Sequence, residues 1–581
     1  MNLKELQAWL GEWDGRAALW LPMTDPTLAE IAAPEWRFAP ALTGFTGSSG
    51  TVLVTRDRAA LLTDSRYWVQ AEGELLPGVE LLRDLPGTDD VWIDWVRRAL
   101  PEGGRLIADQ NLISSAEAER MEDRLGAWVG YAFETRALPR LPAFAPVTPD
   151  IRVLPRPGRT IAERIAAVRA QLPEGDERVL LTASPDVCAW LTNLRNAARP
   201  ASPVFPAVAA LTGDTLHLET NAPLSDACRR MLEDEGVVLT ADLEAALRGA
   251  GVTDRPLVVN RKAVSAALMK RFEGFWSGEI VPAEPFFERA MSRKSPGEIE
   301  LIEEAMRLDG VALTEFYAEL DERLAAGERL GECDAVRLLH EHRAAQPGFM
   351  GESFGTISAF GANAAMPHYE PKPGRDAELK DGLLLIDSGG QYWCGTTDVT
   401  RMTPVGRISD EDRRVVGEVT RAMFCLANAR FPEETPGSEL DVEARGPLHE
   451  RMGEDYGHGT GHGVGFVLNV HEGPMALSPR NHEFLFEGNV LSDEPGIYQE
   501  GVRGVRVENM LVALKDPTAC GMLRWKHLTC VPIDVRTLPE SMGDAAEAVN
   551  AYNAWVRARL TPDLTTRARA WLERVTAPVK A

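Results

Sequence analysis

Cysteine is scarce in this sequence and never forms a metal-binding or redox motif. The 581 residues include only seven cysteines, an odd number, scattered from position 188 to position 530. No two of them form a C-x-x-C pair, which disfavours both a disulfide framework and a thiolate zinc site. The scarcity favours a reducing compartment, and we expect the protein to be cytoplasmic.

Long apolar runs and an excess of positive charge are also missing. No segment has 18 consecutive apolar residues, and the first stretch, MNLKELQAWLGEWDG, is charged and amphipathic, without the apolar core of a secretory signal. Lysine and arginine total 62 against 87 acidic residues, a net charge of −25, which argues against nucleic acid or an anionic membrane as a partner. A P-loop is absent as well, so nucleotide chemistry has no support.

The composition that remains, 44% hydrophobic and 26% charged, is typical of a large globular protein with several domains. A stretch with six prolines, residues 135–160, is interpreted as a linker. Strand-like runs and helical stretches occur on both sides of it: TVLVT, ALLTD and residues 116–129 before it, RVLLTA and PLVVN after it. We expect two α/β domains, at 1–138 and 159–288, and suspect that they are related although no sequence repeat is detectable.

A third domain is expected at 290–581. The segment SPGEIELIEEAMRLDGVALTEFYAEL predicts the long helix that begins it. Ser295 and Glu298 can form a capping box, Pro296 would occupy the first helical position, and apolar residues follow at helical spacing.

The segment YGHGTGHGVGF, residues 456–466, places glycine at every second position around two histidines. An H-x-x-x-H helix that binds zinc is unlikely, because each glycine would cost a helix interior roughly 1 kcal/mol. In an extended segment His458 and His462 stand about 13 Å apart, at roughly 3.3 Å per residue, too far to share one ion. We expect one histidine on a metal and the other beside a substrate; the alternative is a glycine-rich turn with two solvated histidines.

Two pairs of carboxylates stand in this same C-terminal part of the chain. Asp387 ends an apolar strand, where a buried charge needs a partner, and Asp398 follows eleven residues later. Glu494 and Glu508 flank a loop centred on Gly501, so a symmetric hairpin would place them opposite each other, with a cation between them. Each pair alone is also compatible with ordinary acidic turns. Together with one imidazole, the four carboxylates form an oxygen-rich set able to hold two divalent ions.

These five residues, in this order, resemble the dinuclear metal site of the pita-bread metallopeptidases, a family that includes methionine aminopeptidases, prolidases and Xaa-Pro aminopeptidases. Several motifs are similar to those of its Xaa-Pro aminopeptidases: FGTISAFGANAAMPHYEP, DSGGQYWCGTTDVTR, GHGTGHGVGFVLNVHEGP and EPGIYQEGVRGVRVEN. LTGFTGSSGTVLVT and AWLTNLRNAARPASPVF resemble the long, three-domain branch. The resemblance implies two creatinase/prolidase-like α/β domains followed by an α+β pita-bread catalytic domain with a C-terminal extension.

By this resemblance Asp387 would bind one ion, His462 and Glu494 the other, and Asp398 and Glu508 would bridge the two. Manganese is the expected metal, because the oxygen donors outnumber the nitrogen donor four to one.

Other residues match the family's substrate-handling groups. The resemblance implies that His368, His458 and His471 face the substrate and that Glu494 accepts and passes on the proton of the attacking water. It also implies that Arg506, two residues before Glu508 and on the same strand face, orients the ligand carboxylates. The remaining histidines are expected to be ordinary surface or core residues: His217, His340, His342, His449, His482 and His527.

The implied function is a metal-dependent aminopeptidase that releases the first residue from peptides with proline in second position, through a hydroxide activated by two ions. A homodimer is also implied. A prolidase or broad aminopeptidase on the same fold is the alternative, followed by a non-catalytic peptide- or protein-binding module. Cys394 stands where the branch usually has aspartate, a departure that could alter the rim of the site or its sensitivity to thiol reagents.

Overall fold

The computed structural model describes residues 2–84, 91–126, 130–138 and 146–581. The chain divides into two compact units. The first unit comprises 1–153, 161–199 and 204–287; the second comprises 154–160, 200–203 and 288–581.

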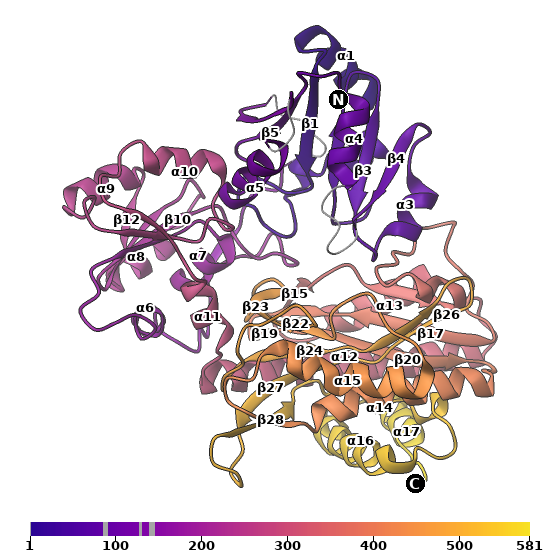
Figure 1. The fold of residues 1–581 in the computed structure, drawn as a ribbon. Coiled ribbons are helices and arrows are strands. Elements are labelled where there is room, and N and C mark those ends of the chain that lie inside the picture. The colour runs from indigo at the N-terminus through magenta and orange to yellow at the C-terminus, as the bar shows by residue number, and fades with distance from the viewer. Residues whose placement is uncertain (1, 85–90, 127–129, 139–145) are drawn as a thin grey trace. The chain divides into compact units, whose positions relative to one another are not determined.

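The first unit contains two six-stranded sheets (Figure 1). The first sheet has the order β4-β3-β2-β1-β5-β6, in which β1 is antiparallel to β2 and parallel to β5. Its strands are β1 (Ala17–Pro22), β2 (Thr51–Val54), β3 (Ala59–Thr63), β4 (Val79–Arg83), β5 (Arg105–Asp109) and β6 (Ala132–Arg136).

The second sheet repeats this topology. Its order is β12-β11-β10-β8-β13-β14, and each pair of neighbours runs in the same relative direction as its counterpart in the first sheet. The suspicion of two related α/β folds is thus confirmed by strand order, although the sequences show no repeat. The strands are β8 (Val179–Thr182), β10 (Val208–Thr212), β11 (Thr215–Glu219), β12 (Val238–Thr240), β13 (Leu257–Val259) and β14 (Ile280–Pro282).

Helices cover both faces of the first sheet, which explains why its central strand is apolar throughout. In β1, Leu19 and Leu21 pack with α1 and α2, whereas Ala18 and Trp20 pack with α4 and α5 on the opposite face. The helices of this unit are α1 (Leu3–Trp13), α2 (Ala39–Thr43), α3 (Trp68–Glu74), α4 (Val91–Ala99), α5 (Ser115–Gly126), α6 (Ile161–Arg169), α7 (Pro185–Thr192), α8 (Asp226–Asp234), α9 (Leu243–Gly249) and α10 (Ala266–Glu273).

The proline-rich stretch is not a free linker where it is described. Ile151–Val153 forms β7, which pairs antiparallel with β9 (Leu194–Asn196), and Arg156 donates a 2.7 Å hydrogen bond to Glu304. Residues 139–145 of this stretch, and the last three residues of the helix expected at 116–129, lie outside the described residues.

The second unit begins with α11 (Phe286–Ser292), which crosses the boundary, and the predicted long helix, α12 (Pro296–Ala325). The capping box is confirmed: the Glu298 amide donates to the Ser295 hydroxyl at 3.1 Å, and the Ser295 amide donates to the Glu298 carboxylate at 2.8 Å. This arrangement satisfies two of the amide groups that a helix start leaves unpaired.

Five further α-helices are described in this unit, around the strands that carry the candidate site. In one core, α12, α13, α14, α16 and α17 pack against the sheet β16-β17-β20, and Figure 1 shows α16 and α17 beside α14. In another core, α15 packs against the sheet β21-β28-β27-β24-β22-β23. The helices are α13 (Glu332–Ala344), α14 (Asp410–Ala427), α15 (Gly437–Met452), α16 (Ala546–Leu560) and α17 (Thr566–Val575).

The shorter sheets and the remaining strands of the second unit are given by their bounds. The three-stranded sheet β15-β18-β19 and the hairpin β25-β26 accompany the two larger sheets. The strands are β15 (Phe349–Glu352), β16 (Ile357–Phe360), β17 (Gly382–Ser388), β18 (Gly390–Tyr392), β19 (Gly395–Thr396), β20 (Val399–Val405), β21 (Arg430–Pro432), β22 (Gly461–Gly463), β23 (Glu472–Leu477), β24 (Val490–Asp493), β25 (Gly496–Gln499), β26 (Arg503–Arg506), β27 (Asn509–Lys515) and β28 (Met522–His527).

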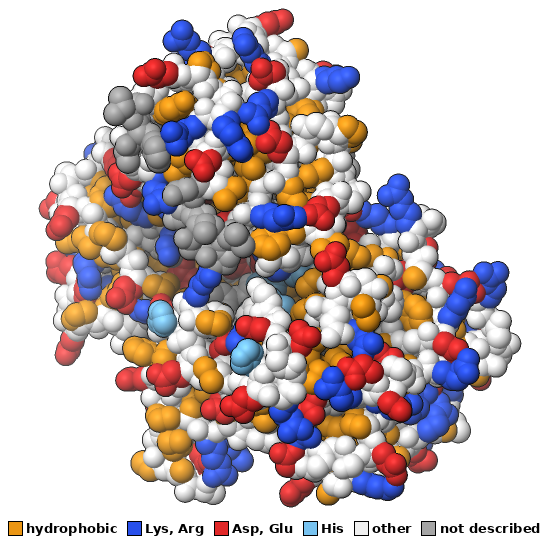
Figure 2. All heavy atoms as spheres, turned by 45° about the vertical axis from the view of Figure 1, so that its right-hand side comes forward, with side chains coloured by type: hydrophobic (Ala, Val, Ile, Leu, Met, Phe, Trp, Pro, Cys, Tyr) orange, Lys and Arg blue, Asp and Glu red, His pale blue; other side chains and the backbone are white. Residues whose placement is uncertain are grey.

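Acidic and basic side chains are interspersed over the face shown in Figure 2. Within the described ranges, none of the helices combines the length and the apolar composition that a transmembrane span needs.

Candidate metal centre

Two aspartates are brought together by the antiparallel pair β17 and β20. The apolar run of β17 leads into Asp387, which lies opposite Thr400, and Asp398 immediately precedes β20. Both carboxylates are buried, with 8% and 4% of their residue surface exposed. A carboxylate at this depth is costly unless a cation or hydrogen bonds compensate it.

The two glutamates face each other as the sequence predicts. The pair β24–β27 aligns Asp493 with Asn509, and the hairpin β25–β26 aligns Gly496 with Arg506. The two ladders share one register, which places Glu494 opposite Glu508. The hairpin turns at Gly501, whose φ of 71° lies in the region that favours glycine.

His462 lies in the middle of a very short strand. β22 covers only Gly461–Gly463, between β23 and β24, so the extended segment expected over 456–466 is wrong outside these three residues. Gly461 allows the close approach to β24, because a Cβ there would lie 1.9 Å from the Ser492 carbonyl oxygen. Before β22, the Arg445 side chain of α15 donates hydrogen bonds to two backbone carbonyls. After β22, Val467 adopts a left-handed conformation (φ 51°).

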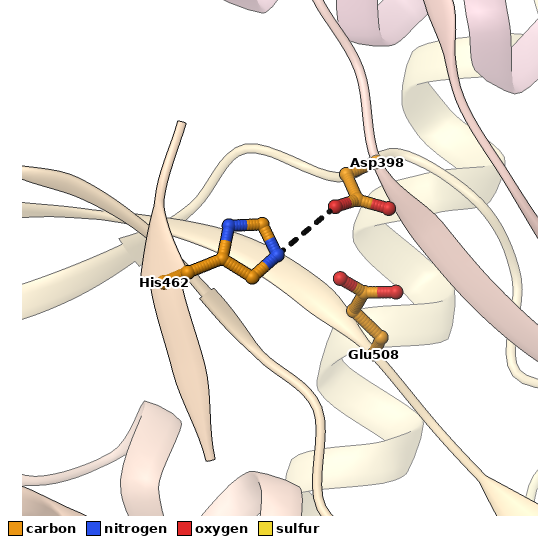
Figure 3. Close-up of side chains that lie close together, drawn as sticks. All are labelled: Asp398, His462 and Glu508. Carbon is orange, nitrogen blue, oxygen red and sulfur yellow. Dashed lines mark ion pairs between the residues drawn. The ribbon is translucent and has the colours of Figure 1, made fainter. Parts of the chain in front are cut away.

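These elements converge on one cluster (Figure 3). Ligand atoms of Asp398, His462 and Glu508 all lie within 4.8 Å of one another. The His462 Nε2 atom lies 3.4 Å from Asp398 Oδ2 and 3.4 Å from Glu494 Oε1. His462 Nδ1 donates to the Gly463 carbonyl at 3.0 Å, which leaves Nε2 as the ligand atom that faces the carboxylates.

The electrostatics of the cluster match a site built for cations. Burial raises the pKa values of Asp387, Glu494 and Glu508, and the neighbouring carboxylates raise them further. The Oδ1 atom of Asp387 has no hydrogen-bond partner among the described residues. Four mutually repelling carboxylates, one orphaned oxygen and an oriented imidazole fit hard divalent ions well.

Arg506 provides part of the compensating charge. Its guanidinium pairs with Asp387 and donates to the Thr400 hydroxyl at 3.1 Å; that hydroxyl in turn donates to Glu508 at 2.7 Å. The shared partner confirms that Arg506 and Glu508 lie on one face.

The other predicted histidines have distinct surroundings. His458 Nε2 lies 2.8 Å from the Tyr498 hydroxyl and therefore has a different partner from His462. The exposed His471 ring packs edge-on against the His462 ring, with 4.2 Å between centroids. His368 lies in the loop between the 3₁₀ turn Gly361–Ala365 and β17.

Sequence reasoning missed Tyr498. Its hydroxyl also accepts a 2.8 Å hydrogen bond from Arg506, so it connects that arginine to His458. The available signal was the predicted hairpin, in which Tyr498 lies opposite Gly504.

Cys394 does not belong to the rim of the site. It is 8% exposed within an apolar cluster that includes Ile302 and Val464, and burial raises the pKa of its thiol to about 12. Burial therefore disfavours the reactive thiolate at this position.

The six histidines without assigned roles include His527, which packs against Phe424 and Tyr552. Burial of its ring lowers its pKa to about 4, which favours the neutral form near pH 7.

Sequence comparisons identify the fold of each part. Residues 300–515 match the model of metallopeptidase family M24, and 521–579 match the C-terminal region of peptidase M24. Residues 42–134 and 145–296 each match a creatinase/prolidase N-terminal domain. The fold and the carboxylate–histidine cluster therefore define a metallopeptidase with two creatinase-type domains and a pita-bread catalytic domain.

Relatives that match nearly the whole chain show which group of metallopeptidase family M24 it is most similar to. A protein of Chaetomium globosum named "Probable Xaa-Pro aminopeptidase P" is 32% identical over 96% of this chain and 95% of its own length. Aminopeptidase P2 of Arabidopsis thaliana is 31% identical over 96% of this chain and 85% of its own. The crystal structure of X-prolyl aminopeptidase from Caenorhabditis elegans, described as a cytosolic enzyme with a di-nuclear active site, superposes with a TM-score of 0.88 at 27% identity, over 97% and 95% of the two chains. The chain belongs to the Xaa-Pro aminopeptidase group of metallopeptidase family M24.

Proposed function

We propose that this protein is a metal-dependent aminopeptidase that removes the first residue from peptides with proline in second position. The proposal is carried by the convergence of Asp398, His462 and Glu508, with Glu494 beside the His462 imidazole. The chain that holds this cluster is related to such enzymes over nearly its whole length.

The site would hold two divalent ions, as the di-nuclear neighbour does. We assign Asp387 to one ion, His462 and Glu494 to the other, and Asp398 and Glu508 to both. Manganese fits a donor set of four carboxylates and one imidazole.

Two ions supply, when bound, a water of lowered pKa and polarisation of the scissile carbonyl. Glu494 would accept the proton of the attacking water. An Xaa-Pro bond is a tertiary amide, so its nitrogen must be protonated before it can leave. His471 and His458, with His368 from the preceding loop, are the candidate groups for proton delivery and oxyanion stabilisation.

A prolidase or a broad aminopeptidase is the second candidate. Against it, the relatives that match both N-terminal domains and the catalytic domain are named as Xaa-Pro aminopeptidases. A non-catalytic binding module is disfavoured because the donor set is complete.

We further propose a cytoplasmic homodimer with domains at 1–138, 159–288 and 290–581. The cytosolic neighbour supports the location.

The test of the proposal is metal removal and reloading. We expect the stripped protein to be inactive on Arg-Pro-Pro, and manganese to restore arginine release with up to two ions bound per chain. Asp398→Ala should bind fewer ions and stay inactive. His471→Ala should keep both ions and lose turnover on the order of 10²-fold, as expected for a positioned proton donor. An Asp398→Ala variant with two ions and normal turnover would refute the site.

A further inference from the structure

The segment Tyr456–Thr460 carries His458 yet has little support of its own. It precedes β22 and belongs to no strand or helix. Glycines at 457 and 459 provide no side chains for packing. Its backbone carbonyls must therefore find partners elsewhere, because buried polar groups are paired in folded proteins.

The partner is Arg445 on α15. Its guanidinium donates to the carbonyl oxygens of Tyr456, at 2.8 Å, and His458, at 3.0 Å. It also lies 4.0 Å from the centre of the Tyr456 ring, over its face. The Arg445 guanidinium thus binds two backbone carbonyls and one aromatic ring of the segment. This geometry requires the several N–H donors of a planar guanidinium group.

Asp441, one turn earlier on α15, holds this arginine and the far end of the segment. Its carboxylate accepts two hydrogen bonds from Arg445, at 2.8 and 3.1 Å, and one from the Thr460 hydroxyl at 2.6 Å. The Thr460 hydroxyl also lies 2.6 Å from the Tyr456 hydroxyl. Asp441 is 1% exposed, and the side chain of Arg445 is 15% exposed, so the ion pair is largely shielded from water.

The segment connects this network to the candidate site at two points. His458 reaches the Tyr498 hydroxyl, and the Thr460 carbonyl accepts a 2.7 Å hydrogen bond from the Glu494 amide. His462 is held independently, by the β22 ladder and by a 3.0 Å bond from its amide to the Ser492 hydroxyl.

From this arrangement we propose that Arg445, held by Asp441, is a positioning residue that fixes His458 for turnover without holding the metal ions. The proposal rests on the function proposed above and concerns the same site. It predicts a separation of effects: loss of Arg445 should lower kcat while the metal content stays normal.

The experiment compares Arg445→Ala and Arg445→Lys with a matched control on the same helix. The control is Arg451→Ala, because Arg451 pairs with Glu418 at the surface and is half exposed. For each reloaded protein we would measure kcat and KM on Arg-Pro-Pro, bound metal, and the rate at which diethylpyrocarbonate modifies His458, read by mass spectrometry.

We expect Arg445→Ala to lose kcat on the order of 10²-fold, the effect of a misplacement of about 1 Å, with both ions retained. Added guanidinium should restore part of this loss, and His458 should react several-fold faster than in the wild type. Arg445→Lys, which keeps the charge without the fork, should also be impaired and remains informative if the alanine variant does not fold. Arg451→Ala should match the wild type.

Normal kcat and normal His458 reactivity in both Arg445 variants would overturn the inference, as would loss of the metal ions from Arg445→Lys. The His458 labelling needs no turnover. If the wild type cleaves no Xaa-Pro peptide, the proposed function fails while the labelling still tests the role of Arg445.

Discussion

At the scale of single residues, the most informative group is the His462 imidazole. Burial opposes its charged form, but the hydrogen bond to Asp398 and the charges of Glu494 and Asp398 outweigh burial and raise its pKa to about 9. In the metal-free protein His462 is therefore protonated at neutral pH, and metal binding must release that proton.

This shift predicts how the stability of the stripped protein depends on pH. The pKa of His462 in the folded protein lies above its unfolded value of about 6.5, so the protonated imidazole stabilises the folded state. This contribution to stability is complete below about pH 6.5 and is lost as pH rises through about 9. We expect the free energy of unfolding of the stripped protein to fall by up to about 1.4 kcal/mol per pH unit in this window. His462→Gln should flatten that slope, as measured by thermal unfolding at several pH values; equal slopes in both proteins would contradict the account.

Single residues were also where sequence reasoning reached its limit. Asp387, Asp398, His462, Glu494 and Glu508 could be selected because their chemistry is unusual for their local pattern. Arg445 and Tyr498 could not, because an arginine on a helix and a tyrosine on a strand are ordinary until the tertiary fold supplies their partners.

At the scale of elements, β22 shows how close packing places a ligand. A Cβ at Gly461 would lie 1.9 Å from a backbone oxygen of β24, which cannot move without breaking the sheet. Gly461→Ala should therefore push β22 away from β24 and displace His462.

We expect Gly461→Ala to lose stability by about 1–3 kcal/mol or more, and to bind metal more weakly. Gly355→Ala is the control, because nothing lies within 4 Å of a Cβ there. Metal titration and chemical denaturation of both variants provide the measurement. Unchanged metal affinity in Gly461→Ala would show that β22 does not set the ligand position.

Elements with strong local signals were predicted well. The capping box at Ser295 and the hairpin centred on Gly501 are confirmed because both depend on residues close in the chain. The extended form of 456–466 failed outside β22, since contacts with α15 and the left-handed Val467 override the local pattern. The related topology of the first two sheets was visible only in strand order.

At the scale of the whole molecule, one buried ion pair ties the start of the second unit to its catalytic sheet. Lys294 precedes α12 and pairs with Glu472 of β23, immediately after His471. Both side chains are at most 3% exposed. A charge at this depth is tolerated only while its partner remains.

Lys294→Met should destabilise the second unit by about 3–5 kcal/mol, because it removes one partner of a buried ion pair. The double variant Lys294→Met/Glu472→Leu should recover most of this loss, since replacing a buried ion pair with apolar groups is often nearly neutral. Urea denaturation of the stripped proteins measures both effects. If the double variant were as unstable as the single one, loss of the ion pair would not explain the instability of Lys294→Met.

Selectivity for proline in second position is the property that distinguishes the proposed function from a prolidase or a broad aminopeptidase. The metal site activates water but cannot by itself recognise proline, so selectivity must come from a pocket shaped for the pyrrolidine ring. The most direct measurement is arginine release by the manganese-loaded protein from Arg-Pro-Pro, Arg-Ala-Pro, N-acetyl-Arg-Pro-Pro and Arg-Pro. We expect fast release of arginine from Arg-Pro-Pro alone. Equal cleavage of the alanine peptide, preference for the dipeptide, or no cleavage with metal bound would each contradict this expectation.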